Sequence, residues 1–140
     1  ASNVPYDWTA PISAGAAAWN SAGAKYRFRG GYADHNVARR SLSSKVIAQT
    51  YVREWWWSSR ITDRDTDFNS SLLWSTNGGA GAYDVQSVAA HEFGHWLMLD
   101  DLYGGSDYWK TMYGVGAPGQ TYQRTLDTDD SNGIRAIYGA

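Results

Sequence analysis

The sequence predicts a single α+β domain, and three observations support this fold class. An alanine-rich segment near the N-terminus is typical of a helix, residues 45–69 are rich in β-branched and aromatic residues, and two later segments begin with helix-capping aspartates. An order of helix, strands and then helices is typical of α+β domains. The 140 residues are enough for one hydrophobic core, so we expect one domain over residues 1–140.

The elements of the first half follow from residue preferences. Residues 11–22 are predicted to be helical, because Pro11 suits the first turn and alanine has the highest helix propensity. The polar stretch 32–44 is predicted to be irregular. Alternating or β-rich composition predicts three strands, at residues 24–28, 45–57 and 61–69.

Two further helices are predicted from their caps. Asp84 can N-cap a helix that starts at Val85 and ends near Met98. Residues 100–124 are rich in Gly and Tyr and are predicted to be irregular. Asp127 can cap a last helix. The buried side of that helix is expected to carry Ile134, Ile137 and Tyr138.

The composition argues against several classes of partner. The formal charge is −2 and no long run of one sign occurs, which disfavours a nucleic acid or an anionic membrane. No apolar stretch approaches the roughly 18 residues of a membrane helix. There is no Cys, so we expect stability to depend on core packing and on any bound ions. The first residues have neither the basic nor the apolar segment of a leader peptide, so we expect a processed or a trimmed chain. We also expect a monomer.

Residues 91–95 read His-Glu-Phe-Gly-His and are the most informative motif. On a helix, His91 and His95 project from one face one turn apart, at a spacing that lets two imidazoles hold one metal ion. Glu92 lies beside them and can take a proton from a water on the metal. The pattern predicts a zinc peptidase site.

A catalytic zinc needs a third protein ligand. The only other histidine, His35, is far upstream, and the only glutamates are Glu54 and Glu92. No glutamate follows the motif, so a downstream glutamate ligand is excluded. The nearby candidates are Asp100 and Asp101.

With Asp101 included, residues 91–101 resemble the zinc signature of metzincin peptidases, His-Glu-x-x-His-x-x-Gly-x-x-His/Asp, in the form with aspartate that the snapalysin family has. Met112 resembles the Met-turn of that clan. Met98 stands where the family has Gly, and a left-handed residue there costs about 1–2 kcal/mol. Further segments are similar to matrixins, namely 83–90, 129–139, the early Ala-Ala-Ala-Trp-Asn helix and Asp67-Phe68-Asn69.

The resemblance implies a fold and a two-part organisation. The fold would be a metzincin-like α+β domain with a twisted, mostly parallel sheet, an antiparallel edge strand, an active-site helix and a small C-terminal subdomain ending in a helix. The upper subdomain would span about residues 1–97 and the lower about 98–140. The chain would be a secreted, extracellular endopeptidase acting on proteins or peptides.

The resemblance also implies roles for single residues. His91, His95 and Asp101 would hold one Zn²⁺, with Asp100 as the alternative third ligand, and Glu92 would be the general base. An extended substrate would pair with an edge strand at residues 46–50, and the alternative is that these residues form an ordinary interior strand. Residues 113–120 would form the wall of the pocket that receives the substrate side chain after the cleaved bond. The candidate substrate-binding residues are Ala48, Gln49, Gly114 and Val115.

Three weaker signals remain. If Trp55, Trp56 and Trp57 lie on a strand, one face is core and the other is a candidate carbohydrate or ligand surface. Asp63, Asp65 and Asp67 share one strand face and form a candidate Ca²⁺ site, although they lack the rest of an EF-hand. Only His35 is spare for the additional structural zinc of matrixins, so we expect that site to be missing.

Two other functions compete with the endopeptidase. One is a catalytically silent zinc-binding or carbohydrate-binding module on the same fold, against which Glu92 argues. The other is a zinc amidase that acts on cell-wall or small amide substrates.

Overall fold

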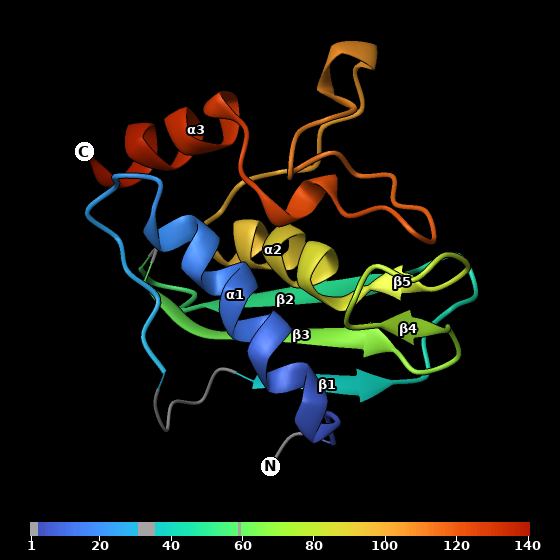
Figure 1. Cartoon of the computed structure of the whole chain (residues 1–140). Coiled ribbons are helices and arrows are strands. Elements are labelled where there is room, and N and C mark those ends of the chain that lie inside the picture. The colour runs from blue at the N-terminus through green and yellow to red at the C-terminus, as the bar shows by residue number, and fades with distance from the viewer. Residues whose placement is uncertain (1–2, 31–35, 59) are drawn as a thin grey trace.

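The computed structural model describes residues 3–30, 36–58 and 60–140, and it consists of a mixed sheet covered on one face by two helices (Figure 1). The order of the strands is β1-β3-β2, with β1 at Asn36–Arg40, β2 at Ala48–Glu54 and β3 at Ile61–Asn69. A second small sheet pairs β4, Trp74–Ser75, with β5, Tyr83–Asp84.

The main sheet has one parallel and one antiparallel pair over the described residues. β1 runs parallel to β3, whereas β2 and β3 form an antiparallel hairpin in which Thr50 lies opposite Thr66. The sheet is therefore mixed there, and the expected mostly parallel arrangement is not seen. β2 is an antiparallel edge strand, in agreement with the expectation from the sequence.

The helices begin close to the predicted residues. A short 3₁₀ turn, η1 at Tyr6–Trp8, leads into α1 at Thr9–Asn20, and α2 follows at Val85–Trp96. Two 3₁₀ turns, η2 at Gly105–Asp107 and η3 at Tyr122–Arg124, precede α3 at Thr128–Tyr138. None of the helices in the described part of the chain has the length and apolar character of a membrane span.

The core lies where α1 and α2 meet the sheet. The indole of Trp19 is 1% exposed and donates a hydrogen bond to the carbonyl of Ala90 at 2.7 Å, which fixes α1 against α2. Phe68 packs from β3 against Trp8, with ring centroids 5.5 Å apart. On α3, Ile134 is fully buried but Ile137 is half exposed, so the predicted burial of Ile137 is wrong.

The predicted strand at residues 24–28 does not form. Instead, both backbone groups of Phe28 bond to the side chain of Asn20, at 2.7 Å and 3.0 Å. The ring of Phe28 packs on Phe93, which explains the apolar alternation without a strand. Conversely, β1 lies within the stretch 32–44 that was predicted to be irregular, because pairing with β3 stabilises five mostly polar residues.

The tryptophan run lies beyond the end of β2, in the turn toward β3, and not on a strand. Trp55, Trp56 and Trp57 are 44%, 89% and 60% exposed, so the expectation that at least one of them is core is wrong. The rings of Trp55 and Trp57 contact each other, with centroids 4.2 Å apart. A carbohydrate-binding role for the tryptophan run stays a prediction.

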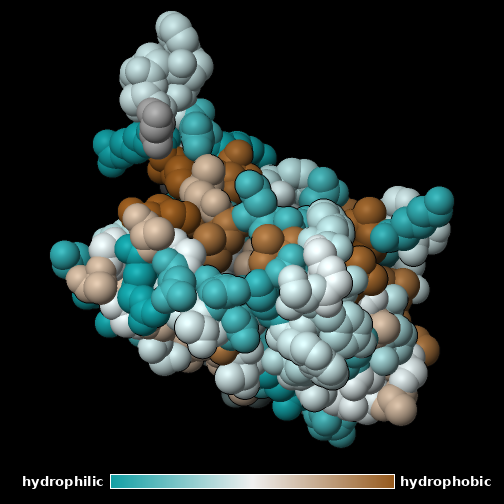
Figure 2. All heavy atoms as spheres, turned by 90° about the horizontal axis from the view of Figure 1, so that it is seen from above, coloured by the Kyte–Doolittle hydropathy of each residue, from teal (hydrophilic) through white to brown (hydrophobic). Residues whose placement is uncertain are grey.

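Elsewhere on the surface, hydrophobic side chains gather in patches among hydrophilic ones (Figure 2).

Candidate zinc centre

The helix that carries the motif is fixed at its N-terminus. The side chain of Asp84 is fully buried, and its carboxylate accepts a hydrogen bond from the backbone N–H of Ser87 at 2.9 Å. Asp84 is therefore the N-cap of α2, as predicted. Arg124 of η3 donates two bonds to the same carboxylate, at 2.9 Å and 2.6 Å. Burial raises the pKa of Asp84, but the bonds from Arg124 and Ser87 outweigh burial and hold the pKa below its usual value. The start of α2 is thereby tied to the C-terminal part of the chain.

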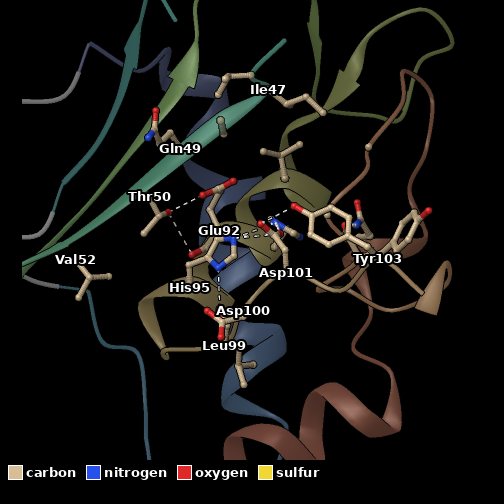
Figure 3. A pocket seen from close by; sticks show the side chains of 18 of the residues that line it. Ile47, Gln49, Thr50, Val52, Glu92, His95, Leu99, Asp100, Asp101 and Tyr103 are labelled. Carbon is tan, nitrogen blue, oxygen red and sulfur yellow. Dashed lines mark hydrogen bonds and ion pairs between the residues drawn. The ribbon is translucent and has the colours of Figure 1, made fainter. Parts of the chain in front are cut away.

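Three acceptor atoms converge at the C-terminal end of α2. The Nε2 atoms of His91 and His95 are 3.2 Å apart, and Oδ1 of Asp101 lies 3.0 Å from the first and 3.5 Å from the second (Figure 3). Tetrahedral ligands at 2.0–2.2 Å from Zn²⁺ are separated by about 3.3 Å. The triangle therefore has the size that a zinc ion requires.

The tautomers of both histidines follow from their other ring nitrogen. Nδ1 of His91 lies 2.8 Å from the carbonyl of Thr111, and Nδ1 of His95 lies 2.8 Å from the carbonyl of Leu99. A carbonyl only accepts, so each Nδ1 carries a proton, and in the neutral rings each Nε2 presents a lone pair. Two lone pairs and a carboxylate oxygen then face one point, an arrangement that a cation stabilises.

The electrostatics of the cluster agree with this geometry. Burial lowers the pKa of His95, but hydrogen bonding to Asp101 and the charge of Glu92 outweigh burial and raise the pKa to about 9. Hydrogen bonds from His91 and His95 hold the pKa of Asp101 far below its usual value. The cluster therefore favours positive charge at its centre.

Asp100 and Asp101, the two candidates for the third ligand, both line the cleft beside the histidines. Only Asp101 is paired with the histidines in the described structure. Asp101 forms the two contacts given above, and its Oδ2 accepts a bond from the hydroxyl of Tyr103 at 3.3 Å. Asp100 is exposed at the rim. The carboxylate of Glu92 is also near both histidines, within 4.8 Å, but it is held by Thr50 of β2 at 2.6 Å. Asp101 is thus the better third ligand by geometry.

The end of α2 brings Asp101 to this position. The N–H of Met98 bonds to the carbonyl of His95 at 2.9 Å, and the N–H of Leu99 bonds to that of Gly94 at 3.1 Å, which is a Schellman motif. Met98 has φ of 65° and is the one non-glycine residue with positive φ in the described ranges. The strained turn aims the carbonyl of Leu99 at His95 and leads the chain back to the metal ligands.

Replacing Met98 by glycine is expected to stabilise the protein by about 0.5–1 kcal/mol. Relief of the left-handed strain contributes about 1–2 kcal/mol, and the larger entropy of an unfolded glycine offsets roughly half of it. Met98 is 44% exposed, so little packing is lost. Denaturant unfolding of M98G and M98A measures this. M98A keeps the Cβ and serves as the control, and equal stability of the two variants would contradict the strain.

Met112 is buried beside α2, the helix that carries the two histidines, and its role as a Met-turn stays a prediction. It is 2% exposed, and its side chain fills the space beside Gly94 on α2. The buried carboxylate of Asp130, on α3, accepts bonds from the N–H groups of Thr111 at 2.8 Å and Met112 at 3.3 Å. The turn that presents the Thr111 carbonyl to His91 is therefore fixed from below by the last helix.

The cluster opens into a cleft of about 610 Å³ between β2 and the C-terminal segment. Of the four predicted substrate-binding residues, Ala48, Gln49 and Gly114 line the cleft, whereas Val115 is not among the lining residues and is 53% exposed. The side chain of Gln49 points away from the cluster in Figure 3.

The three aspartates of the candidate calcium site lie on β3, where arginines already contact two of them. Asp63 pairs with Arg53 at 3.1 Å and Asp67 with Arg40 at 3.0 Å. Asp65 accepts a bond from the backbone N–H of Asn36 at 3.0 Å. Calcium binding there stays a prediction, and these ion pairs weaken it. His35, the spare histidine, lies outside the described residues.

Sequence reasoning missed several residues that support the site. Thr50, Asp130 and Gly94 carry no recognisable signature in the sequence, because their roles arise from contacts between distant segments. Thr111 could have been suspected from its place beside Met112, but its carbonyl contact with His91 depends on the fold.

Comparison with known proteins agrees with this geometry. The sequence model of the family described as Matrixin matches residues 25–139. Metalloendoproteinase 1 of Glycine max is 36% identical over 84 residues, covering 56% of this chain and 26% of that protein. Neutrophil collagenase of Homo sapiens is 43% identical over 75 residues, covering 54% of this chain and 15% of that protein. The chain thus matches about a quarter or less of the length of these curated relatives.

Proposed function

Because this chain belongs to the matrixin family, we propose that it is a zinc-dependent endopeptidase that hydrolyses peptide bonds in extended polypeptides. The observation that carries the proposal is the triangle formed by two imidazole lone pairs and one carboxylate oxygen, beside a buried glutamate. His91, His95 and Asp101 fit a zinc ion by donor type and by spacing. Zinc in such a site lowers the pKa of a water molecule and polarises a carbonyl group.

Glu92 would act as the general base and then as the acid. Its carboxylate is 5% exposed and lines the cleft next to both histidines. It would accept a proton from the attacking water and deliver that proton to the amine of the leaving peptide. The carbonyls of Thr111 and Leu99 hold the Nδ1 atoms of His91 and His95, so that the Nε2 atom of each ring would face the zinc ion.

The substrate would lie along β2. This strand pairs on one side with β3 and has its other edge at the cleft, so an extended peptide can add to it by backbone hydrogen bonds. We propose that Ala48 and Gln49 contribute that edge and that Gly114 forms part of the opposite wall. The cleft would then separate an upper subdomain from a lower one near residue 98. We also propose that the protein acts outside the cell.

Cleavage of casein by the purified, zinc-loaded chain tests the proposal. We expect cleavage that a chelator abolishes and that added Zn²⁺ restores, with about one zinc ion per chain. Glu92→Ala should be inactive while still binding zinc. Zinc binding without cleavage of any peptide would instead support the silent module, and cleavage of only small amides would support the amidase.

A further inference from the structure

A chain of hydrogen bonds runs from a buried indole to the carboxylate of Glu92. Nε1 of Trp96 donates to Oγ1 of Thr66 at 2.8 Å, and Thr66 lies 2.7 Å from Oγ1 of Thr50. Thr50 in turn donates to Oε2 of Glu92 at 2.6 Å (Figure 3). We call these residues, Trp96, Thr66, Thr50 and Glu92, the relay. Thr66 is 1% exposed and Trp96 8%, so water has little access to its inner half.

The direction of every bond in the relay is fixed by counting protons. The indole N–H can only donate, so Thr66 accepts from Trp96. An ionised Glu92 can only accept, so the single hydroxyl proton of Thr50 points to Glu92. Thr66 must therefore supply the proton in its bond to Thr50. Thr50 also lies 3.4 Å from the carbonyl of Glu92, but the 2.6 Å contact with the carboxylate is much shorter.

The relay joins the edge strand to the active-site helix. Glu92 and Trp96 lie four residues apart on one face of α2, and Thr50 and Thr66 are cross-strand partners on β2 and β3. Both threonine side chains lie on the sheet face toward α2. The edge of β2 therefore borders the cleft, and the side chain of Thr50 on the same strand holds Glu92.

We infer that Thr50 is a positioning residue for Glu92, an inference that rests on the proposed function. Its hydroxyl occupies Oε2 and leaves Oε1 as the oxygen that exchanges a proton with the water and the leaving amine. The carboxylate is thereby held in one orientation before the substrate arrives, and this preorganisation lowers the barrier of the chemical step. Thr66 and Trp96 act one step further back, by orienting the Thr50 hydroxyl.

Carbon-13 NMR of the glutamate carboxyl groups tests the contact without any activity. The chain has two glutamates, so labelling with glutamate that carries ¹³C at the side-chain carboxyl carbon, Cδ, gives two signals. One comes from Glu92, and the other comes from the exposed Glu54 and serves as an internal reference. At one fixed pH, Thr50→Val should move the Glu92 signal and leave that of Glu54 in place. Thr50→Ser keeps the hydroxyl and should leave both signals near their wild-type positions. An unmoved Glu92 signal in T50V would overturn the inference.

Kinetics of the zinc-loaded enzyme test the consequence. T50V should lower kcat by about tenfold with KM within about twofold, because a misplaced base affects the chemical step more than binding. T50S keeps the hydroxyl and should recover most of kcat. A loss of activity that came only from lower stability would not be restored by the hydroxyl in this way. Thr62→Val removes an exposed hydroxyl on the same hairpin and should behave as wild type. A wild-type kcat in T50V would also overturn the inference.

The two arms separate this inference from the proposed function. If the wild-type chain cleaves no peptide, the endopeptidase proposal fails, and the NMR arm still decides whether Thr50 holds Glu92 in the zinc-free protein. If the wild type cleaves and T50V cleaves equally well, the proposed function stands and the role of Thr50 is rejected.

Discussion

Glu92→Gln is expected to reduce kcat/KM for peptide hydrolysis by about 10²–10⁴, because a general base contributes a factor of that size. The glutamine amide oxygen can still accept the Thr50 proton, so the side chain should keep its position. It cannot take a proton from water at neutral pH. Zinc content should stay near one per chain, because Glu92 is proposed as a base and not as a ligand. Steady-state kinetics and metal analysis of the same preparation measure both quantities.

Glu54→Gln is the matched control for this variant. Glu54 is the other glutamate of the chain and is exposed at the end of β2, on the strand that holds Glu92 through Thr50. It should keep wild-type kcat/KM. Two results would contradict the assignment of Glu92. One is wild-type activity in E92Q, and the other is loss of zinc from E92Q, which would make Glu92 a ligand.

Gly94→Ala is expected to destabilise the protein by about 1–3 kcal/mol, a typical cost of overpacking a core. A Cβ at residue 94 would overlap the sulfur of Met112 and would lie 2.9 Å from the ring of Trp19. Trp19 cannot move aside, because its indole is bonded to Ala90. A gain in helix propensity of up to about 1 kcal/mol offsets part of this cost. Denaturant unfolding of the zinc-free protein measures the difference.

The same substitution should also weaken zinc binding. Displacement of Met112 shifts Thr111, whose carbonyl holds the ring of His91, and such outer contacts typically change metal affinity by 10–100-fold. Gly105→Ala is the control, because a Cβ there meets no atom within 4 Å. Unchanged stability and unchanged zinc affinity in G94A would show that Met112 does not support the site in this way.

The site was predictable where its chemistry is local in the sequence. Helical spacing predicts that His91, Glu92 and His95 belong to one site. The resemblance to the metzincin signature adds Asp101 and Met112 as candidates. The strain at Met98 was also foreseen, because a helix that must turn back sharply requires a left-handed residue, and the structure has φ of 65° there.

The rest depends on contacts that a single sequence does not encode locally. Thr50 became part of the site because the β2–β3 register places it opposite Thr66 and over Glu92. The strand at Asn36–Arg40 has little intrinsic β preference and is stabilised by pairing with β3. Residues 24–28 have the right alternation but pair with no strand among the described residues. Trp55, Trp56 and Trp57 have high β propensity, yet they lie in an exposed turn beyond the end of β2.

The most direct test of the zinc centre is an anomalous-scattering map of crystals of the zinc-loaded protein, measured on both sides of the zinc absorption edge. We expect one strong peak at 2.0–2.2 Å from Nε2 of His91, Nε2 of His95 and a carboxylate oxygen of Asp101. A peak coordinated by Asp100 or Glu92 in place of Asp101, or no peak beside the two histidines, would contradict the account.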